Sequence, residues 1–311
     1  MKSTTARRIT LSVVAVTTLG AVVACSPGDS SGSPKASGKD DGAAGRGVVH
    51  VSPVAALRSA DTSTAEAHSA RVSMTTSIGT LMSMKGNGTL DWADGLTGRL
   101  TLTYTGGTVA EAMRQIGATT MEARYLPDAY YAHMPDAYAE QTGGKHWIRY
   151  RYDDLANLAG GSGAYMQEQL KTATPNQSVK LLLASGDVRK VGEATVRGEH
   201  TTHYAGTLNV ADFADRTSNL PKRQMDDLKK QLDEAGVTTE SVDIWVNDKN
   251  LLVKKVEKAD MATGTMTNTA YYSDYGVKTA VQAPPAGDTG DFKDLMASQG
   301  AAAAGGSGSG T

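Results

Sequence analysis

Short segments in which apolar and polar residues alternate fill most of this chain, and they limit the folds open to it. The run from Met82 to Trp92 shows the pattern plainly, because apolar or small residues alternate there with Ser, Lys, Asn, Thr and Asp. A period of two places successive side chains on opposite faces of a strand. The pattern predicts strands at 70–78, 82–92, 99–104, 119–126, 129–134, 146–151, 187–197, 200–209, 239–248, 251–260 and 264–275.

The connections between these strands are short, which fixes how the strands pair. Turn-type residues separate several of them, as at Pro127-Asp128 and at Asn247-Asp-Lys-Asn250. Consecutive strands that are joined by tight turns pair antiparallel. We therefore predict an α+β fold built on one large, curved antiparallel sheet of about eleven strands.

Helical patterns interrupt the strands near 153–185 and 211–236. Ser52-Pro53 is typical of a helix start, and Thr174 to Gly186 combines a capping-box pattern with a glycine stop. Pro221 to Ala235 has the apolar spacing of an amphipathic helix, and 108–118 reads as a short helical insertion. These helices must cover an apolar surface.

The N-terminus has the three parts of an export signal. Lys2, Arg7 and Arg8 form a basic region, and the apolar stretch that follows is too short and too polar to span a bilayer comfortably. It ends in Val-Val-Ala before Cys25, the only cysteine of the chain, and this resembles the bacterial lipobox. We predict a lipoprotein signal peptide over 1–24 and a diacylglycerol on Cys25, with or without an N-acyl group. The alternative is a plain secretory signal with an incidental cysteine.

The rest of the chain reads as one domain between two low-complexity ends. Residues 25–47 form the lipidated cysteine and a Gly/Ser/Pro-rich tether, 48–292 the domain, and 293–311 a low-complexity tail. Removing 1–24 takes away three basic residues, so the net charge falls from −2 to −5. Nucleic-acid binding needs a basic surface, and we therefore expect none.

Several motifs, taken in order, resemble the LppX/LprG-type lipoproteins of actinobacteria over most of residues 50–292. The motifs are Leu181 to Val188, Val191-Gly-Glu193, Thr201 to Tyr204 with Gly206-Thr-Leu208, Val242 to Val246, Tyr272 to Gly276 and Ala283-Pro-Pro285. The resemblance implies a half-open β-barrel with helices over its concave side and an apolar cavity for acyl chains or glycolipids. The export signal and the acyl groups expected on Cys25 predict attachment to the outer face of the cell membrane. The helical insertion at 108–118 departs from the family and leaves the cavity size and the ligand open.

Methionine is the residue type that best suits such a cavity, because its flexible, polarizable side chain adapts to irregular apolar partners. The alternative is that these methionines fill an ordinary core. Tyrosines are also numerous enough to edge a pocket, among them Tyr130 and Tyr150. The candidate cavity residues are Met74, Met82, Met84, Leu100, Leu102, Met121, Met134, Leu182 and Met225.

Catalytic and metal-binding patterns are weak. His200 and His203 have H-x-x-H spacing, but in a strand residues three apart face opposite ways. Gly160 to Ala164 lacks the last glycine of a serine elbow. We therefore expect no enzyme, no metal and no cofactor besides the acyl groups on Cys25. The leading hypothesis is a lipid carrier or chaperone of the cell envelope. The alternative is a sensor or scaffold lipoprotein with a filled core that binds a protein partner. The ligand, the direction of transport and any envelope transporter partner are not identifiable from the sequence.

Overall fold

The computed structural model describes residues 52–140, 143–158, 163–165, 167–168, 170, 174–217 and 220–305. The predicted signal peptide, Cys25 and the tether over 25–47 lie outside the described residues. Within the described part of the chain, no helix combines the length and the apolar character that crossing a membrane requires.

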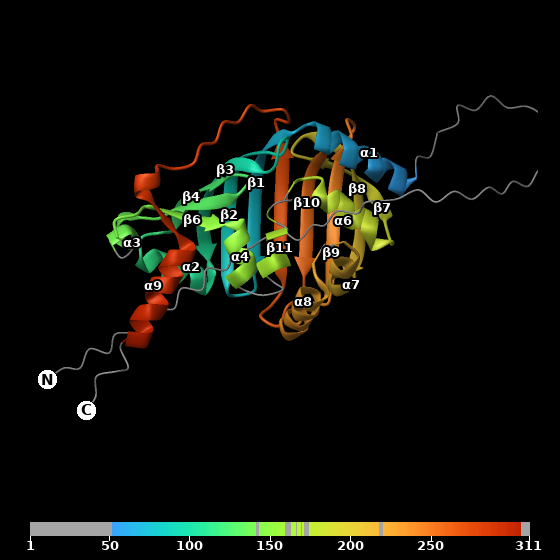
Figure 1. The fold of residues 1–311 in the computed structure, drawn as a ribbon. Helices are drawn as coiled ribbons and strands as arrows, with labels where there is room; N and C mark the ends of the chain where they lie inside the picture. The colour runs from blue at the N-terminus through green and yellow to red at the C-terminus, as the bar shows by residue number, and fades with distance from the viewer. Residues whose placement is uncertain are drawn as a thin grey trace, which may run out of the picture.

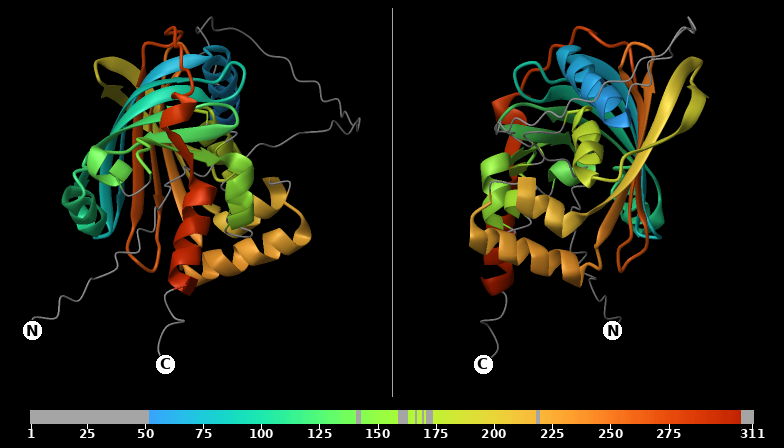
Figure 2. Two further views of the ribbon diagram at one scale, coloured as in Figure 1. Left: turned by 60° about the vertical axis from the view of Figure 1, so that its left-hand side comes forward. Right: turned by 90° about the vertical axis from the view of Figure 1, so that its right-hand side faces the viewer.

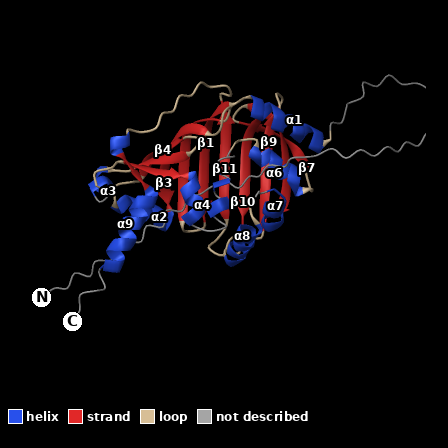
Figure 3. Cartoon of the chain, viewed as in Figure 1, coloured by secondary structure: helices blue, strands red, loops and turns tan. Residues whose placement is uncertain are grey.

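The strands form one curved layer (Figures 1 and 3). In the described residues the sheet has twelve strands in the order β12-β6-β5-β4-β3-β2-β1-β11-β10-β9-β8-β7. Every pairing is antiparallel except that of β12 with β6. The two ends of this order, β12 and β7, do not pair with each other, so the sheet stays open. The strands are β1 Ser69–Ile78, β2 Met82–Asp91, β3 Thr97–Gly106, β4 Thr120–Tyr125, β5 Ala129–His133, β6 Trp147–Arg151, β7 Arg189–Val196, β8 Glu199–Asn209, β9 Thr239–Asn247, β10 Leu252–Ala259, β11 Met266–Ser273 and β12 Thr289–Asp291.

Helices gather on the concave side of the sheet, where Figure 2 shows the red α9 and the gold α7 and α8. Helix α6 packs against β8 and β9, α2 contacts β2 and β3, and α4 and α9 pack against β6. The helices are α1 Pro53–Glu66, α2 Gly107–Gln115, α3 Asp136–Ala139, α4 Tyr152–Leu158, α6 Gln177–Ser185, α7 Val210–Thr217, α8 Lys222–Glu234 and α9 Phe292–Gly305.

Local sequence signals set the helix ends. The Ser52 side chain accepts a hydrogen bond from the Ala55 amide (3.2 Å) and Pro53 occupies the first turn, so α1 begins where its sequence predicts. Gly186 ends α6 in the left-handed conformation with φ +80°, which glycine adopts without steric cost. The predicted helices at 108–118 and 221–235 correspond to α2 and α8.

Strand pairing identifies the two faces of the sheet, because directly paired residues lie on the same face. Met74 pairs with Gly86, Gly86 with Leu102, and Leu102 with Met121. On the other side of β1, Met74 pairs with Ala270. We call the face that carries these residues the inner face, since the helices pack on it.

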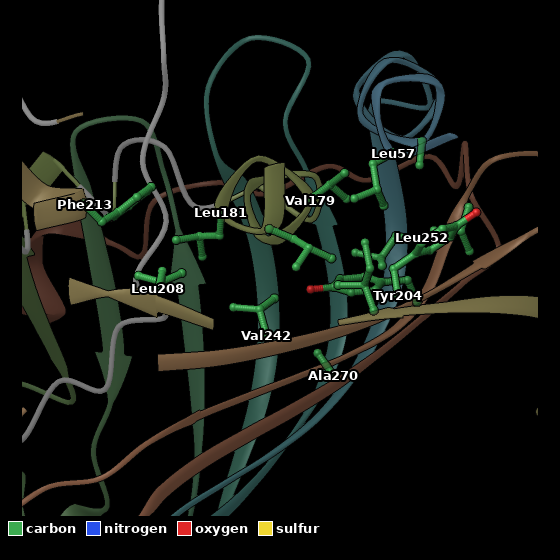
Figure 4. Packing of buried hydrophobic residues seen from close by; sticks show 14 of the residues in the cluster. Leu57, Val179, Leu181, Tyr204, Leu208, Phe213, Val242, Leu252 and Ala270 are labelled. Atoms are coloured by element: carbon green, nitrogen blue, oxygen red, sulfur yellow. The ribbon is translucent and has the colours of Figure 1, made fainter. Parts of the chain in front are cut away.

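The inner face is filled over β8 to β11. Val179, Leu181 and Leu182 of α6 and Leu57 of α1 are fully buried, and they form one apolar cluster with residues of these strands (Figure 4). Leu182 and Ser185 of α6 lie so close to Gly206 of β8 that a side chain at position 206 would collide with them. This half of the molecule is therefore an ordinary core.

The fold class predicted from the sequence is confirmed, and all eleven expected strands are present. The twelfth strand, β12, was not predicted. Helix α9 lies in the stretch interpreted as a low-complexity tail over 293–311, and its Phe292 and Leu295 pack against Ile148, Tyr150 and neighbouring buried residues.

Candidate functional site

The strand residues among the candidates meet on the inner face of β1 to β4. Thr76 pairs with Met84, and Ile78 pairs with Met82. Leu100 and Leu102 are two positions apart on β3 and therefore share a face. We call this set the methionine patch: Met74, Met82, Met84, Leu100, Leu102 and Met121.

The methionine patch is only partly covered. Met82, Met84 and Leu100 are buried, whereas Met74, Leu102 and Met121 keep accessible surface. Side-chain atoms of Met74 and Leu102 occupy the space that a side chain at Gly86 would need. Glycine at this position therefore leaves room for both side chains against the sheet. Apolar side chains therefore stay partly accessible on the face of the sheet that is turned towards the helices.

The other candidates lie elsewhere. Met134 is buried with Ile148 and Leu170. Leu182 belongs to the filled core under α6, and Met225 packs with Ala214 and Leu228 from α7 and α8. The structure therefore brings together the six residues of the methionine patch. Leu182 and Met225 lie apart from it, whereas Met134 belongs to a buried cluster against which Met121 of the patch also packs.

A row of aromatic rings continues the inner face from β4 to α9. The ring of Tyr130 stacks on Tyr150 at 4.4 Å with an interplanar angle of 1°, and Tyr125 lies 6.1 Å from Tyr130. Tyr150 in turn contacts Phe292 of α9 at 4.7 Å. Tyr104 shares this face, because it pairs with Met84. The row therefore borders the methionine patch.

The phenols of this row are desolvated although several rings remain accessible. Burial, helped by Tyr104, raises the pKa of Tyr125 to about 12, and burial raises the pKa of Tyr130 well above its ordinary value. The residues Tyr104, Tyr125 and Tyr130 are nonetheless only half-buried. The hydroxyl of Tyr130 is thus withdrawn from water, although part of its side chain stays accessible. These phenols stay protonated and neutral at physiological pH.

A buried polar network lies on the inner face beside the methionine patch. Glu257 of β10 accepts hydrogen bonds from Lys255 Nζ (3.0 and 2.9 Å), Ser178 Oγ (2.6 Å) and Asn268 Nδ2 (3.0 Å). Thr76, which is paired with Met84, donates to Asn268 Oδ1 (3.2 Å). Lys255 and Glu257 are 5% and 1% exposed, so this ion pair is withdrawn from water. Removing one member of such a buried ion pair is strongly destabilising, because the other charge is left uncompensated.

Burial and neighbouring charges shift the pKa values of Lys255 and of the nearby Glu240. Burial lowers the pKa of Lys255, but Glu257, Tyr272 and Glu240 together raise it by more, so the net shift of the pKa is upward and Lys255 stays charged. Burial, and then the charge of Glu257, raise the pKa of Glu240 well above its usual range. Its Oε2 has no hydrogen-bond partner within the described residues. Glu240 is thus a carboxyl that favours the neutral form.

The two histidines of the H-x-x-H pattern bind different aspartates. His200 contacts Asp248 at 2.9 Å and His203 contacts Asp243 at 2.7 Å. Over the residues that the structure describes, no group of three or more His, Cys, Asp or Glu side chains is placed to hold a metal ion.

Sequence reasoning missed the polar network. Its signal is polar residues at inner-face positions of three neighbouring strands, namely Thr76, Asn268 and Glu257. That signal depends on the strand register, which the alternation of a single strand does not contain. The tyrosines were named as a group, but the structure divides them: Tyr130 and Tyr150 lie on the inner face, and Tyr271 stacks with the cationic side chains of Arg197 and Lys254.

Comparison with known proteins places the chain among lipoproteins. It is 49% identical over 310 residues to the protein named "Putative lipoprotein SCO4650" from Streptomyces coelicolor, covering 96% of this chain and 100% of the relative. No family model matches the chain.

Two solved mycobacterial structures share the fold at low identity. LppX from Mycobacterium tuberculosis is 13% identical with a TM-score of 0.46, over 74% of this chain and 98% of LppX. LprF from Mycobacterium bovis is 13% identical with a TM-score of 0.42, over 75% of this chain and 96% of LprF. These names agree with the LppX/LprG-type resemblance found in the sequence.

Proposed function

Because this chain belongs to the actinobacterial lipoprotein family that includes Streptomyces coelicolor SCO4650, we propose that it is a membrane-anchored carrier or chaperone that binds lipid acyl chains against the inner face of its sheet. The proposed role is non-enzymatic. It operates in the cell envelope, on the outer face of the cell membrane.

The observation that carries the proposal is the accessible apolar surface on the inner face. Met74, Leu102 and Met121 keep free surface on the side of the sheet that the helices cover. The rest of the inner face, over β8 to β11, is filled by α1 and α6. An acyl chain laid along the methionine patch would leave water at about 0.8 kcal/mol per CH₂ group.

The shape of the molecule supports reversible binding. The sheet is open at both ends of its strand order, and helices bridge its concave side (Figure 2). A site between a rigid sheet and separate helices can open when a helix moves, without breaking the strand pairing. A carrier needs this property, because it must take up a lipid and release it.

The anchor is proposed at Cys25, which is the only cysteine in the sequence. Two acyl chains on this residue hold a protein stably at a membrane, whereas one chain holds it marginally. We expect Cys25→Ser to release the protein from the membrane fraction or to leave it unprocessed, as measured by fractionation and immunoblotting. A mature-sized Cys25→Ser product that stays with the membranes contradicts this part of the proposal.

The lipid-binding role is tested on a soluble form that lacks residues 1–25. Organic extracts of the purified protein, analysed by mass spectrometry, are expected to contain acyl lipids in a fixed ratio to protein. The matched control is Met74→Trp with Leu102→Trp, which fills the methionine patch with larger apolar side chains and should reduce the lipid recovered. A protein that carries no lipid and takes up none when incubated with lipid vesicles would support the scaffold alternative.

A further inference from the structure

The outer face of the sheet carries a row of aromatic and basic side chains over β8 to β11, and we call His203, Trp245, Lys254, Tyr271 and Arg197 the outer ladder. The strand register aligns four of them, because His203 pairs with Trp245, Trp245 with Lys254, and Lys254 with Tyr271. The ring of His203 stacks on Trp245 at 4.2 Å. Lys254 Nζ lies 3.9 Å from the ring centre of Trp245, and Arg197 Cζ lies 3.9 Å from that of Tyr271. The outer ladder therefore holds two cations against two large aromatic rings.

The two cations of the outer ladder are held by rings and not by carboxylates. Within the described residues, neither Arg197 nor Lys254 forms an ion pair, and the contacts that position them are those with Trp245 and Tyr271. An aromatic ring attracts a cation through its quadrupole and leaves the positive charge in place. The outer ladder therefore presents two positioned charges that can still bind an anion.

The shape of this face favours an extended partner over a small molecule. The outer ladder lies on the convex side of the sheet, whereas α7, α8 and α9 lie on the concave side (Figure 2). Small ligands bind in concave sites, but a convex face can rest on a flat surface. Trp245, Lys254 and Tyr271 keep part of their surface accessible, and Arg197 is exposed. Trp, Tyr, Lys and Arg each join an apolar body to a polar or charged end, which suits the interface between a bilayer and water.

The chain that leads from Cys25 enters the fold beside the outer ladder. The described residues begin at Ser52 with α1, which lies across one end of the strands (Figure 1). Thr64 Oγ1 of α1 accepts a hydrogen bond from the Leu252 amide (3.2 Å), two positions before Lys254. A Gly/Ser-rich chain of the length between Cys25 and Ser52 spans roughly 30 Å. An acyl anchor at Cys25 would therefore keep the outer ladder close to the membrane.

We propose that the outer ladder docks the protein on a bilayer that contains anionic phospholipids. Arg197 and Lys254 bind headgroup phosphates, and the accessible edges of Trp245 and Tyr271 enter the interface. The inference rests on the proposed membrane anchor and adds an orientation to it. The convex face lies on the membrane, and the inner face with its helices is turned away from it.

The test uses a chain that lacks residues 1–25, which keeps every residue that the structure describes and carries no anchor. Sedimentation compares its partition onto vesicles of equal parts phosphatidylglycerol and phosphatidylcholine with its partition onto phosphatidylcholine alone. We expect partition onto the anionic vesicles to be at least about tenfold stronger and to weaken as salt is added. Brominated lipids in the anionic vesicles should quench the tryptophan fluorescence, and Trp245→Phe should abolish this quenching. Equal partition onto both kinds of vesicle, or quenching that persists in Trp245→Phe, overturns the proposal.

Removal of single charges identifies the docking face. Lys254→Gln and Arg197→Gln are each expected to weaken partition onto the anionic vesicles about fivefold. The matched control, Lys222→Gln, removes an exposed positive charge from α8 and should change partition by less than about twofold.

Two results would contradict the assignment of the outer ladder. A loss in Lys222→Gln as large as in the ladder variants would show attraction by net charge alone. No partition onto either kind of vesicle would overturn membrane docking and favour an acidic protein partner on this face. The anchor is tested separately by fractionation of Cys25→Ser, so failure of the docking face and failure of the anchor are distinguishable.

Discussion

The buried ion pair between Lys255 and Glu257 gives the sharpest prediction about stability. Replacing Glu257 by Leu leaves the Lys255 ammonium 5% exposed and without its carboxylate, and it removes the acceptor of Ser178 and Asn268. Breaking a buried pair on one side costs about 3–5 kcal/mol. In a domain of this size, that loss lowers the melting temperature by roughly 6–20 °C.

Two matched variants separate the effect of burying an unpaired charge from the effect of losing an ion pair. Asp226→Asn breaks the exposed pair with Lys222, whose side chains are 58% and 88% exposed, and should cost at most about 0.5 kcal/mol. The double variant Lys255→Met/Glu257→Leu removes both buried charges. It is expected to recover most of the stability that Glu257→Leu loses, because no uncompensated charge remains inside.

The assay is urea unfolding of each variant, followed by circular dichroism and by intrinsic fluorescence, with the free energy of unfolding extrapolated to water. The expected order of stability is Asp226→Asn near the unmodified protein, then the double variant, then Glu257→Leu well below both. The loss of stability would not come from an uncompensated buried charge if Glu257→Leu were as stable as Asp226→Asn, or if the double variant were less stable than Glu257→Leu.

Two further predictions concern Glu240 and the glycines of the sheet. Because the folded state raises the pKa of Glu240, its stability contribution is present at acid pH, below the unfolded value, and is lost as the pH rises towards the raised pKa. Glu240→Gln should therefore melt higher than the unmodified protein at pH 8, with the difference vanishing near pH 4 in a series of melting curves; a pH-independent difference would exclude this cause. Gly88→Ala places a Cβ atom 1.9 Å from the carbonyl oxygen of Arg99, so it should lower the free energy of unfolding by about 1–3 kcal/mol or more. Gly192→Ala is the control, because no atom lies within 4 Å of its Cβ position, and it should be close to neutral. Urea unfolding of both variants measures the difference.

The strands were predictable because their signal is local. Each of β1 to β11 has alternation or turn residues of its own, and the eleven expected ranges correspond to these strands. The strand β12 has three residues, too few for a period to be visible. It pairs with β6 through residues distant in sequence, among them Arg149 and Asp291, whose side chains also form an ion pair at 2.6 Å. Contacts of that kind leave no periodic trace in a single sequence.

The candidate site was predictable only in part. Alternation placed Met82 and Met84 on one face, and the register shows that Met74, Leu102 and Met121 share it. Which of these side chains is buried depends on what packs against them from elsewhere in the chain, and the sequence of a strand does not encode that. The methionines therefore divide into buried and accessible ones, a distinction that composition alone could not make.

The polar network was hidden for a different reason. In β10 charged residues occur on both faces, as Lys254 and Lys255 follow each other, and the pairing of β10 with β9 is irregular between Leu252 and Lys254. A shift of one position exchanges the two faces of a strand. The sequence could not show which lysine points inward, and the structure assigns that position to Lys255.

Photo-crosslinking tests the central claim, that acyl chains bind on the inner face, most directly. A palmitoyl ester with a photoreactive group along its chain is incubated with the protein and irradiated, and the labelled residues are mapped by peptide mass spectrometry. We expect label on the methionine patch, at Met74, Leu102 and Met121, and we expect unlabelled ester to compete with it. Label confined to outer-face residues such as Trp245 and Tyr271, or no competable label at all, would contradict it.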